Sequence, residues 1–319
     1  MKLSPSRTAR AALRASALAA AALVAACGGG DQSTLFSATR VIAFGDESSL
    51  ITADGRKYSV NAFASGSSTA LDCRSNPIWV QTVAASFGLS FPQCPSATPS
   101  AVPLASRIRA RVGAKAADLA GQIDAQIADG GIRGGDLVTL LVGVNDVIAQ
   151  FERSPAASEA DLLAAMDTAG AVLAGQANRL AALDARVLIS TLPDVGLMPY
   201  SGDRSAGSTN PNPALLSRMS VRFNDSMLTA LLNDGRKIGL IQLDQYLNAV
   251  DRATRFGQGT YANTSQGACA VALPDCTTGT LVAGVGTTSW LWADDRRLGA
   301  RGQSDLGSLA VSRVNTNPF

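Results

Sequence analysis

The sequence of 319 residues contains no histidine. Imidazole is the usual general base near neutral pH, so its absence excludes Ser-His, Cys-His and histidine-metal chemistry. A Gly-x-Ser-x-Gly motif is also missing, which closes the α/β-hydrolase route to an esterase. The sequence has no phosphate-loop or dinucleotide fingerprint, and no acidic cluster has the spacing of an oxygen-ligand metal site. We therefore expect neither a cofactor nor a bound metal.

An excess of charge of one sign and a high aromatic content are missing as well. The chain has 27 Lys and Arg against 25 Asp and Glu, and 5% of its residues are aromatic. Four of the cations lie in the first 26 residues, so the remainder carries 23 basic against 25 acidic side chains and is slightly acidic. Because there is no basic stripe with interleaved aromatic residues, we expect no nucleic-acid partner.

The N-terminal segment has the pattern of an export signal. Residues 1–26 carry four basic residues and no acidic one, and they end in an apolar, Ala-rich run over 15–26 that is too short to span a bilayer. The run ends in Leu-Val-Ala-Ala followed by Cys27, which resembles the signal of bacterial lipoproteins, whose cysteine is acylated. A plain signal-peptidase site with Cys27 spare is the alternative.

The residues after Cys27 favour the lipoprotein interpretation. Residues 28–33 are polar and Gly-rich, which is typical of a flexible tether. In lipoproteins, a non-acidic residue after the cysteine, here Gly28, goes with sorting to the outer membrane. We therefore expect an exported protein with a signal peptide over 1–26 and a tether over 27–39, anchored in the lipid bilayer of the outer membrane through acylated Cys27.

The other four cysteines also agree with export. Cys73, Cys94, Cys269 and Cys276 are an even number, as disulfides in an oxidising compartment require. Three pairings are open, and proximity in the sequence favours Cys73 with Cys94 and Cys269 with Cys276. A thiolate metal site is the alternative, although the spacing lacks a Cys-x-x-Cys unit.

Short apolar runs alternate with longer segments of helical period. We expect strands over 40–44, 108–112, 137–142, 186–192 and 238–243, and helices over 76–87, 116–127, 158–183, 213–232 and 302–314. This alternation predicts the α/β class, as a three-layer α/β/α sandwich around a doubly wound, five-stranded parallel sheet. No repeat or change of composition divides residues 40–319, so we expect a single domain with long surface loops over 201–212 and 255–287.

Four short motifs follow the predicted strands or precede the last helix. In chain order they are Phe44-Gly45-Asp46, Gly113, Gly143-x-Asn145-Asp146 and Asp294-x-x-Arg297. In this order and spacing they resemble the four blocks of the SGNH/GDSL hydrolases, a family of secreted esterases and lipases. Residues 192–196 and 243–269 also resemble the branch found in bacterial outer-membrane and autotransporter esterases. The resemblance covers nearly the whole chain after the signal, and it implies a flavodoxin-like sheet with an ester-cleaving crevice beyond the carboxyl ends of its strands.

The sequence departs from this family at the two reacting positions. The nucleophilic serine of the family directly follows Gly-Asp, but Glu47 stands there and Ser48 comes one place later. The catalytic histidine of the family lies three residues after Asp294, where this chain has Arg297. A second histidine, often found six residues further on, is Gln303 here. The resemblance therefore implies a site without its catalytic base and with its nucleophile replaced or displaced.

The groups that stabilise the oxyanion in this family are retained. They are the backbone N–H of the nucleophile, the N–H of the second-block glycine and the side chain of the third-block asparagine. The resemblance assigns these roles to Glu47, Gly113 and Asn145. A turn role for Gly113 and a turn or helix-cap role for Asn145 are the structural alternatives. Asp46 and Asp146 we expect to hold loops through backbone hydrogen bonds.

The two substitutions at the reacting positions are chemically complementary. Glu47 and Asp294 are acids, and Arg297 offers five N–H donors in a fork that accommodates two carboxylates. We therefore expect a salt-bridged network in place of the triad. A separation of more than about 6 Å between the Glu47 carboxylate and the Arg297 guanidinium would contradict this hypothesis. Two solvated surface charges without contact are the alternative.

Two functions follow from these observations. In the first, the chain is a catalytically degenerate member of the family that binds an acyl, glycan or protein partner in the crevice where the family cleaves esters. In the second, it is an active ester hydrolase that uses the displaced Ser48 and a carboxylate base. A carboxylate of ordinary pKa is a weak base for a hydroxyl, so the second requires a base whose pKa burial has raised.

Overall fold

The computed structural model describes residues 36–95, 105–202 and 212–319, and residues 37–319 form one compact unit. The signal segment and Cys27 lie outside the described residues. The helices and strands, in chain order, are β1 (Arg40–Gly45), α2 (Trp79–Ser86), β2 (Arg107–Ile108), α3 (Leu119–Ala128), β3 (Asp136–Leu141), α4 (Val144–Phe151), α5 (Glu159–Ala182), β4 (Arg186–Ser190), α6 (Pro213–Ala230), β5 (Ile238–Ile241), α7 (Leu243–Arg255), β6 (Asn263–Gly267), β7 (Trp290–Trp292) and α8 (Ala300–Thr316).

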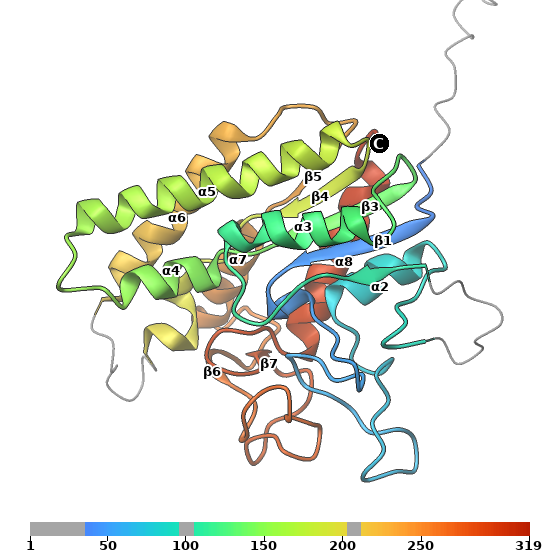
Figure 1. Cartoon of the computed structure of the whole chain (residues 1–319). Helices are drawn as coiled ribbons and strands as arrows, with labels where there is room; N and C mark the ends of the chain where they lie inside the picture. The colour runs from blue at the N-terminus through green and yellow to red at the C-terminus, as the bar shows by residue number, and fades with distance from the viewer. Residues whose placement is uncertain (1–35, 96–104, 203–211) are drawn as a thin grey trace, which may run out of the picture. The chain divides into compact units, whose positions relative to one another are not determined.

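A five-stranded parallel sheet forms the centre of this unit, with the strand order β2-β1-β3-β4-β5 (Figure 1). β1 and β3 pair along their whole lengths, from Arg40 opposite Asp136 to Gly45 opposite Leu141. Every residue of β3 is buried, and so are five of the six residues of β1. Strands that are covered on both faces have this pattern, so the predicted α/β fold with a five-stranded parallel sheet is confirmed.

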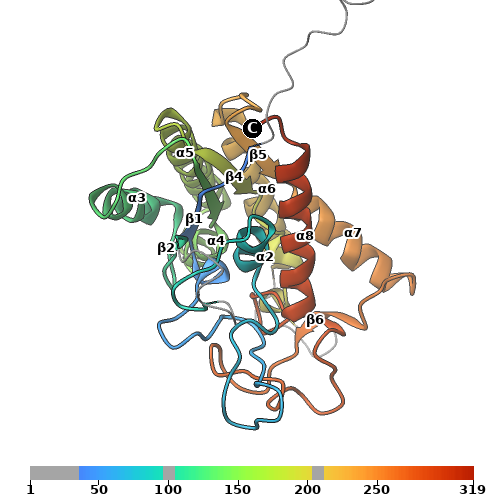
Figure 2. The same ribbon diagram turned by 90° about the vertical axis from the view of Figure 1, so that its right-hand side faces the viewer.

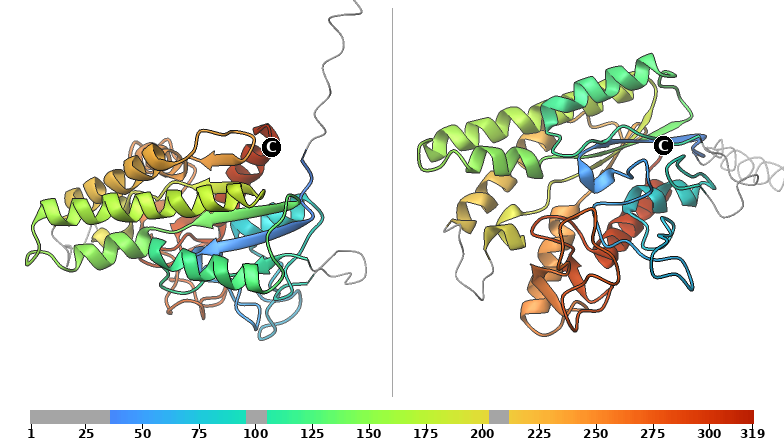
Figure 3. Two further views of the ribbon diagram at one scale, coloured as in Figure 1. Left: turned by 45° about the horizontal axis from the view of Figure 1, so that its top comes forward. Right: turned by 60° about the horizontal axis from the view of Figure 1, so that its bottom comes forward.

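Helices cover both faces of the sheet (Figures 2 and 3). On one face lie α3 and α5, and α6 packs along α5; on the other face lie α2 and α8. Gly170 allows the close approach of α5 and α6, because a Cβ at this position would lie 2.3 Å from the carbonyl oxygen of Phe223. Ser158 caps the start of α5 by accepting the N–H of Asp161.

The structure differs from the predicted elements in several places. The second strand is limited to Arg107–Ile108, because the N–H groups of Arg109 and Ala110 both turn to the carbonyl of Ala43 and the regular ladder stops. Two helices, α4 and α7, were not expected from the sequence. Residues 255–287, predicted to be loop, include β6, which pairs with β7 in a small parallel sheet. Most of the predicted loop over 201–212 lies outside the described residues.

The loop that contains residues 59–61 meets the segment over 274–298 beside the carboxyl ends of the sheet, in the lower part of Figure 1. Asn61 connects them: its backbone N–H donates to the carbonyl of Cys276, and its side-chain amide donates to the carbonyl of Pro274, both at 2.9 Å. The hydroxyl of Ser59 donates to the carbonyl of Leu298 at 2.9 Å. These contacts fix the residues that immediately precede α8.

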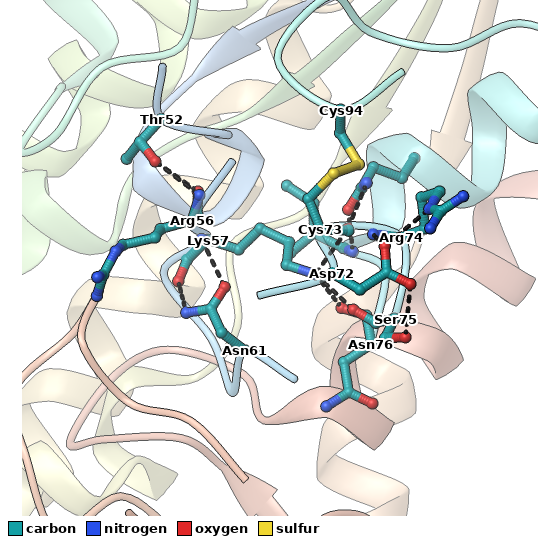
Figure 4. The surroundings of a disulfide bond; sticks show 12 residues. Thr52, Arg56, Lys57, Asn61, Asp72, Cys73, Arg74, Ser75, Asn76 and Cys94 are labelled. Atoms are coloured by element: carbon teal, nitrogen blue, oxygen red, sulfur yellow. Dashed lines mark hydrogen bonds and ion pairs between the residues drawn. A yellow bond between two sulfur atoms is a disulfide. The ribbon is translucent and has the colours of Figure 1, made fainter. Parts of the chain in front are cut away.

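Both predicted disulfides, Cys73–Cys94 and Cys269–Cys276, are present, so this pairing is confirmed. Beside the first lies a fully buried lysine, Lys57 (Figure 4). Its ammonium group donates to three backbone carbonyls, those of Cys73, Ser75 and Asn76, at 2.9, 2.6 and 2.9 Å. Burial lowers the pKa of Lys57 to about 8. The ammonium therefore holds this loop by hydrogen bonds to neutral oxygen atoms.

Candidate functional site

The predicted site residues gather where the order of the strands reverses. β1 lies between β2 and β3, so the chain leaves β1 in one direction along the sheet and later returns to its other side. In open parallel sheets, ligands bind outside the carboxyl ends of the strands at such a switch point. Glu47 opens a short 3-10 helix (Glu47–Ser49) directly after β1, and Asn145 lies in the first turn of α4, directly after β3.

A close backbone contact sets the turn at the end of β1. Gly45 has a φ of +126°, and a Cβ on this residue would lie 2.0 Å from the carbonyl oxygen of Leu141, so only glycine fits. The side chain of Gln122 holds the backbone of the same residue: it accepts from the N–H of Gly45 and donates to the carbonyl of Gly45, both at 2.9 Å. The following side chain, Asp46, accepts the N–H of Ser48 at 2.9 Å. These bonds turn Glu47 away from the strand direction.

The carboxylate of Glu47 occupies the centre of the site. This residue is only 3% exposed. Its Oε1 accepts two hydrogen bonds from Arg297, at 2.5 Å from Nη2 and 3.0 Å from Nε. Its Oε2 accepts the backbone N–H of Gly113 at 2.8 Å and the side-chain amide of Asn145 at 3.2 Å. Two of the three groups predicted to stabilise a substrate oxyanion, the N–H of Gly113 and the side chain of Asn145, are therefore bound to a carboxylate of the protein itself.

Arg297 connects this carboxylate to a second one. Its Nη1 donates to Oδ2 of Asp294 at 2.9 Å. The other carboxylate oxygen of Asp294 accepts the backbone N–H groups of Arg296 and Arg297, at 3.0 and 2.7 Å. The side chains of Arg297 and Asp294 are 17% and 21% exposed, so the network opens to solvent on this side. The three side chains predicted as an acid, guanidinium and acid network are therefore in direct contact.

Burial and the neighbouring charges shift the pKa values of Glu47, Asp294 and Arg297. Burial raises the pKa of Glu47, but the positive charge of Arg297 and the N–H groups of Gly113 and of Glu47 itself outweigh it, so this pKa lies below its ordinary value. Burial raises the pKa of Asp294 in spite of Arg297. Burial lowers the pKa of Arg297, but Asp294 and Glu47 together raise it further. At neutral pH the site holds an ionised Glu47 paired with a charged Arg297.

Ser48 lies beside the carboxyl group of Asp46. No hydrogen bond joins Ser48 to Glu47 or Asp294 in the described part of the chain, because Arg297 and backbone N–H groups engage both acids. Ser48 instead meets Asp46, whose Oδ1 accepts its backbone N–H at 2.9 Å. Burial, followed by the charge of Glu47, raises the pKa of Asp46 to about 7.

The remaining residues of the four motifs have structural partners. Asp146 accepts the N–H of Ala116 with both oxygen atoms, at 3.2 and 3.0 Å, and burial raises its pKa to about 6. Gln303 is fully buried and accepts the N–H of Trp79 at 3.1 Å, at the start of α2. Ser49 is also buried, and its hydroxyl accepts the indole N–H of Trp79 at 3.1 Å. These contacts join the loop after β1 to α2 and α8.

The described residues form neither a metal site nor a membrane-spanning helix. Within residues 36–95, 105–202 and 212–319, no three His, Cys, Asp or Glu side chains lie close enough together to hold a metal ion. None of the helices in these ranges has both the length and the apolar character that a membrane span requires.

Sequence reasoning did not identify the environment of Asp46 and Ser48. Asp46 was expected only to hold a loop, which it does, but its raised pKa depends on complete burial beside Glu47. An acidic residue two positions before a serine was the available signal, since this spacing is typical of an Asx turn. Lys57 was also missed, because it lies in a loop without periodic pattern.

No family model matches the chain, and no curated protein is similar to it in sequence. Several solved structures are similar in fold. A lipase from a goat rumen metagenome has 13% sequence identity and a TM-score of 0.50, over 88% of this chain and 98% of that one. An extracellular lipase from Streptomyces rimosus has 18% identity and a TM-score of 0.43, over 88% and 100%. The acetylxylan esterase Axe2 from Geobacillus stearothermophilus has 11% identity and a TM-score of 0.42, over 90% and 99%. The first of these likenesses shows that the chain has the fold of that lipase.

Proposed function

We propose that this chain is an exported lipoprotein of the SGNH/GDSL hydrolase family that has lost ester hydrolysis and acts as a binding module for an acyl, glycan or protein partner. The single observation that carries this proposal is the position of the Glu47 carboxylate. Its Oε2 accepts hydrogen bonds from Gly113 and Asn145, the donors that an ester carbonyl would need. A substrate would have to displace a buried, paired carboxylate before it could react.

The chemistry at the two substituted positions supports the same conclusion. A glutamate at the serine position has no hydroxyl to attack an acyl carbon. Arg297 at the histidine position is always protonated near neutral pH, so it accepts no proton from a nucleophile. Binding and an oxyanion site alone leave on the order of 10³ to 10⁴ over the reaction in water, which is too little for a working esterase.

Export and membrane anchoring are proposed from the sequence. The basic and apolar pattern of residues 1–26, followed by Cys27 and a polar tether, favours an acylated N-terminus in the outer membrane. Two disulfides in the domain are typical of an oxidising compartment. The bilayer is then a partner through the acyl chains of Cys27, and the site after β1 and β3 is available for a separate ligand.

Turnover of p-nitrophenyl acyl esters tests the proposal. The protein without residues 1–27 should show no turnover above background, whereas the double variant Glu47→Ser, Arg297→His should gain activity, because it restores a nucleophile and a base around the existing donors. The double variant Glu47→Ser, Arg296→His is the matched control, since it places the new histidine on the adjacent position. Turnover by the unmodified protein would contradict the proposal.

One observation favours a second function, a histidine-free ester hydrolase. Ser48 lies against Asp46, whose pKa of about 7 suits a general base near neutral pH. In this mechanism Asp46 would accept the hydroxyl proton of Ser48 while that oxygen attacks the ester carbonyl. Turnover that is lost in both Ser48→Ala and Asp46→Asn would establish this function. Turnover that survives in either variant would exclude it.

A further inference from the structure

The donors around Glu47 form a complete receptor for a carboxylate. Arg297 offers Nε and Nη2 to one oxygen, while Gly113 and Asn145 bind the other. These donors come from segments that lie 66, 98 and 250 residues from Glu47 in the sequence. A guanidinium fork combined with further N–H donors is the arrangement that proteins use to bind carboxylates. The site therefore selects for a group with two oxygen atoms and one negative charge.

The receptor can be reached from solvent. Gly113 is exposed and Asn145 is half-buried, although the Glu47 carboxylate that they bind is buried. A methyl group built on Gly113 would meet no atom within 4 Å, so the space beside this peptide is open. Arg297 also retains partial exposure. A ligand that approaches along Gly113 can therefore reach the donors without unfolding the surrounding loops.

The rim of the receptor beside Gly113 carries two basic residues. Arg111 and Lys115 flank Gly113 in the sequence, and both are exposed. Neither forms an ion pair with any residue of the described ranges, whereas Arg109, on the same segment, is paired with Asp129. Exposed cations attract anions. The positive charge of Lys115 also acts on Asp146, and on the other side of the site Arg297 is neighboured by the carboxylates of Asp294 and Asp295.

Charge balance distinguishes a carboxylate from a neutral ester as the ligand. If an ester carbonyl took the place of Glu47, the buried side of Arg297 would lose its negative partner, which is costly at low exposure. A ligand carboxylate replaces one negative charge with another and keeps every donor satisfied. The same argument applies to the free acid of an acyl chain and to a uronate or other acidic sugar.

We propose that the site binds the carboxylate group of a ligand, which exchanges with the side chain of Glu47 for the donors of Arg297, Gly113 and Asn145. This inference rests on the proposed function, because it takes the site as a binding site. It adds the chemical class of the ligand and identifies Glu47 as an internal competitor. Because Glu47 is tethered, its effective concentration is high, and the affinity for an external carboxylate is reduced accordingly.

Titration of the intact protein with butyrate tests this proposal, with butyramide as the neutral control at constant ionic strength. Binding is followed by the NMR signals of the Asn145 side-chain amide and the Gly113 N–H. Butyrate should shift both signals in the unmodified protein, and the affinity should rise roughly tenfold or more in Glu47→Ala, which lacks the competitor. Glu47→Gln keeps the shape of the side chain and should lie between the two, which controls for a loss of packing in the alanine variant.

The rim is tested by the double variant Arg111→Ala, Lys115→Ala, which should weaken butyrate binding. Arg236→Ala is the matched control, since this arginine is 83% exposed and precedes β5, away from the carboxyl ends of the strands. The proposal would be overturned if the unmodified protein and Glu47→Ala bound butyrate with equal affinity. It would also be overturned if only Glu47→Ala bound butyrate, or if butyramide bound as well as butyrate. These outcomes do not depend on ester turnover, so a failure here is distinguishable from a failure of the proposed function.

Discussion

Replacement of Arg297 by methionine should destabilise the protein by about 3–5 kcal/mol at neutral pH, the usual cost of removing one partner from a buried ion pair. Methionine keeps much of the aliphatic volume but removes the guanidinium group. Glu47, which is 3% exposed, would then keep only the hydrogen bonds from Gly113 and Asn145 on one oxygen and none from Arg297 on the other. Asp294 would lose the same partner but would retain two backbone N–H donors.

The cost should depend on pH in a defined direction. In the unmodified protein the pKa of Glu47 lies below 4.5, so its ionised form stabilises the fold above that pH and this contribution is lost as the pH falls. Without Arg297, burial is opposed only by the remaining N–H donors, so the pKa of Glu47 should rise and its ionised form should stabilise the fold less above pH 4.5 than in the unmodified protein. The difference in the free energy of unfolding between the two proteins should therefore shrink as the pH is lowered and grow as it is raised.

Urea unfolding at neutral pH and near pH 4.5 measures both effects. Arg296→Met is the matched control: this neighbouring arginine pairs with Asp295, and the two side chains are 25% and 44% exposed. At such exposure the control should cost less than about 1 kcal/mol. The double variant Glu47→Leu, Arg297→Met should recover much of the loss, because no buried charge remains. If Arg297→Met cost no more than Arg296→Met, or if its cost did not change with pH, the network would not be the buried pair described here.

Two further predictions concern the other buried titratable groups. Asp46→Asn should leave stability nearly unchanged below pH 4 and should raise it above pH 7 by at most about 4 kcal/mol: burial raises the pKa of Asp46 from 3.8 to about 7, so its ionisation destabilises the fold as the pH rises through this window. Thermal unfolding of both proteins across this range would measure the effect, and a constant difference would contradict it. Lys57→Met should lower the free energy of unfolding by at least about 2 kcal/mol, because three carbonyls of residues 73–76 lose their donor. Lys237→Met is the control for denaturant unfolding, because this lysine is only half-buried and it pairs with Asp184, whose side chain is 66% exposed.

Much of the fold could be predicted because its signals are local. Four of the five strands are short apolar runs, and β3 in particular is buried on both faces, as its sequence, apolar on either side of Thr139, indicated. The long α5 has a serine cap at its start and a repeating Ala/Leu face. The helices α4 and α7 were missed because each begins within three residues of a strand end, where the apolar pattern of the strand runs directly into that of the helix.

The membership of the site was also readable from the sequence. Four motifs in order placed Glu47, Gly113, Asn145 and Arg297 at strand ends or before the last helix, and the opposite charges of Glu47 and Arg297 indicated that they pair. The rule that the carboxyl ends of parallel strands meet at one edge brings Glu47, Gly113 and Asn145 together, whereas the roles of these residues and the inclusion of Asp294 and Arg297 rested on the resemblance to the SGNH/GDSL blocks.

The tertiary structure decided which atoms meet and what their charges are. That Oε2 of Glu47 accepts the N–H of Gly113 and the side-chain amide of Asn145 depends on contacts between residues 66 and 98 positions apart. The raised pKa of Asp46 and the lowered pKa of Lys57 depend on complete burial, which composition does not reveal. Residue types and their spacing therefore determined the kind of site. The path of the backbone determined that the Glu47 carboxylate occupies the donors of Gly113 and Asn145. The reason is that hydrogen bonds and desolvation act over distances of a few ångströms, which only the folded chain defines.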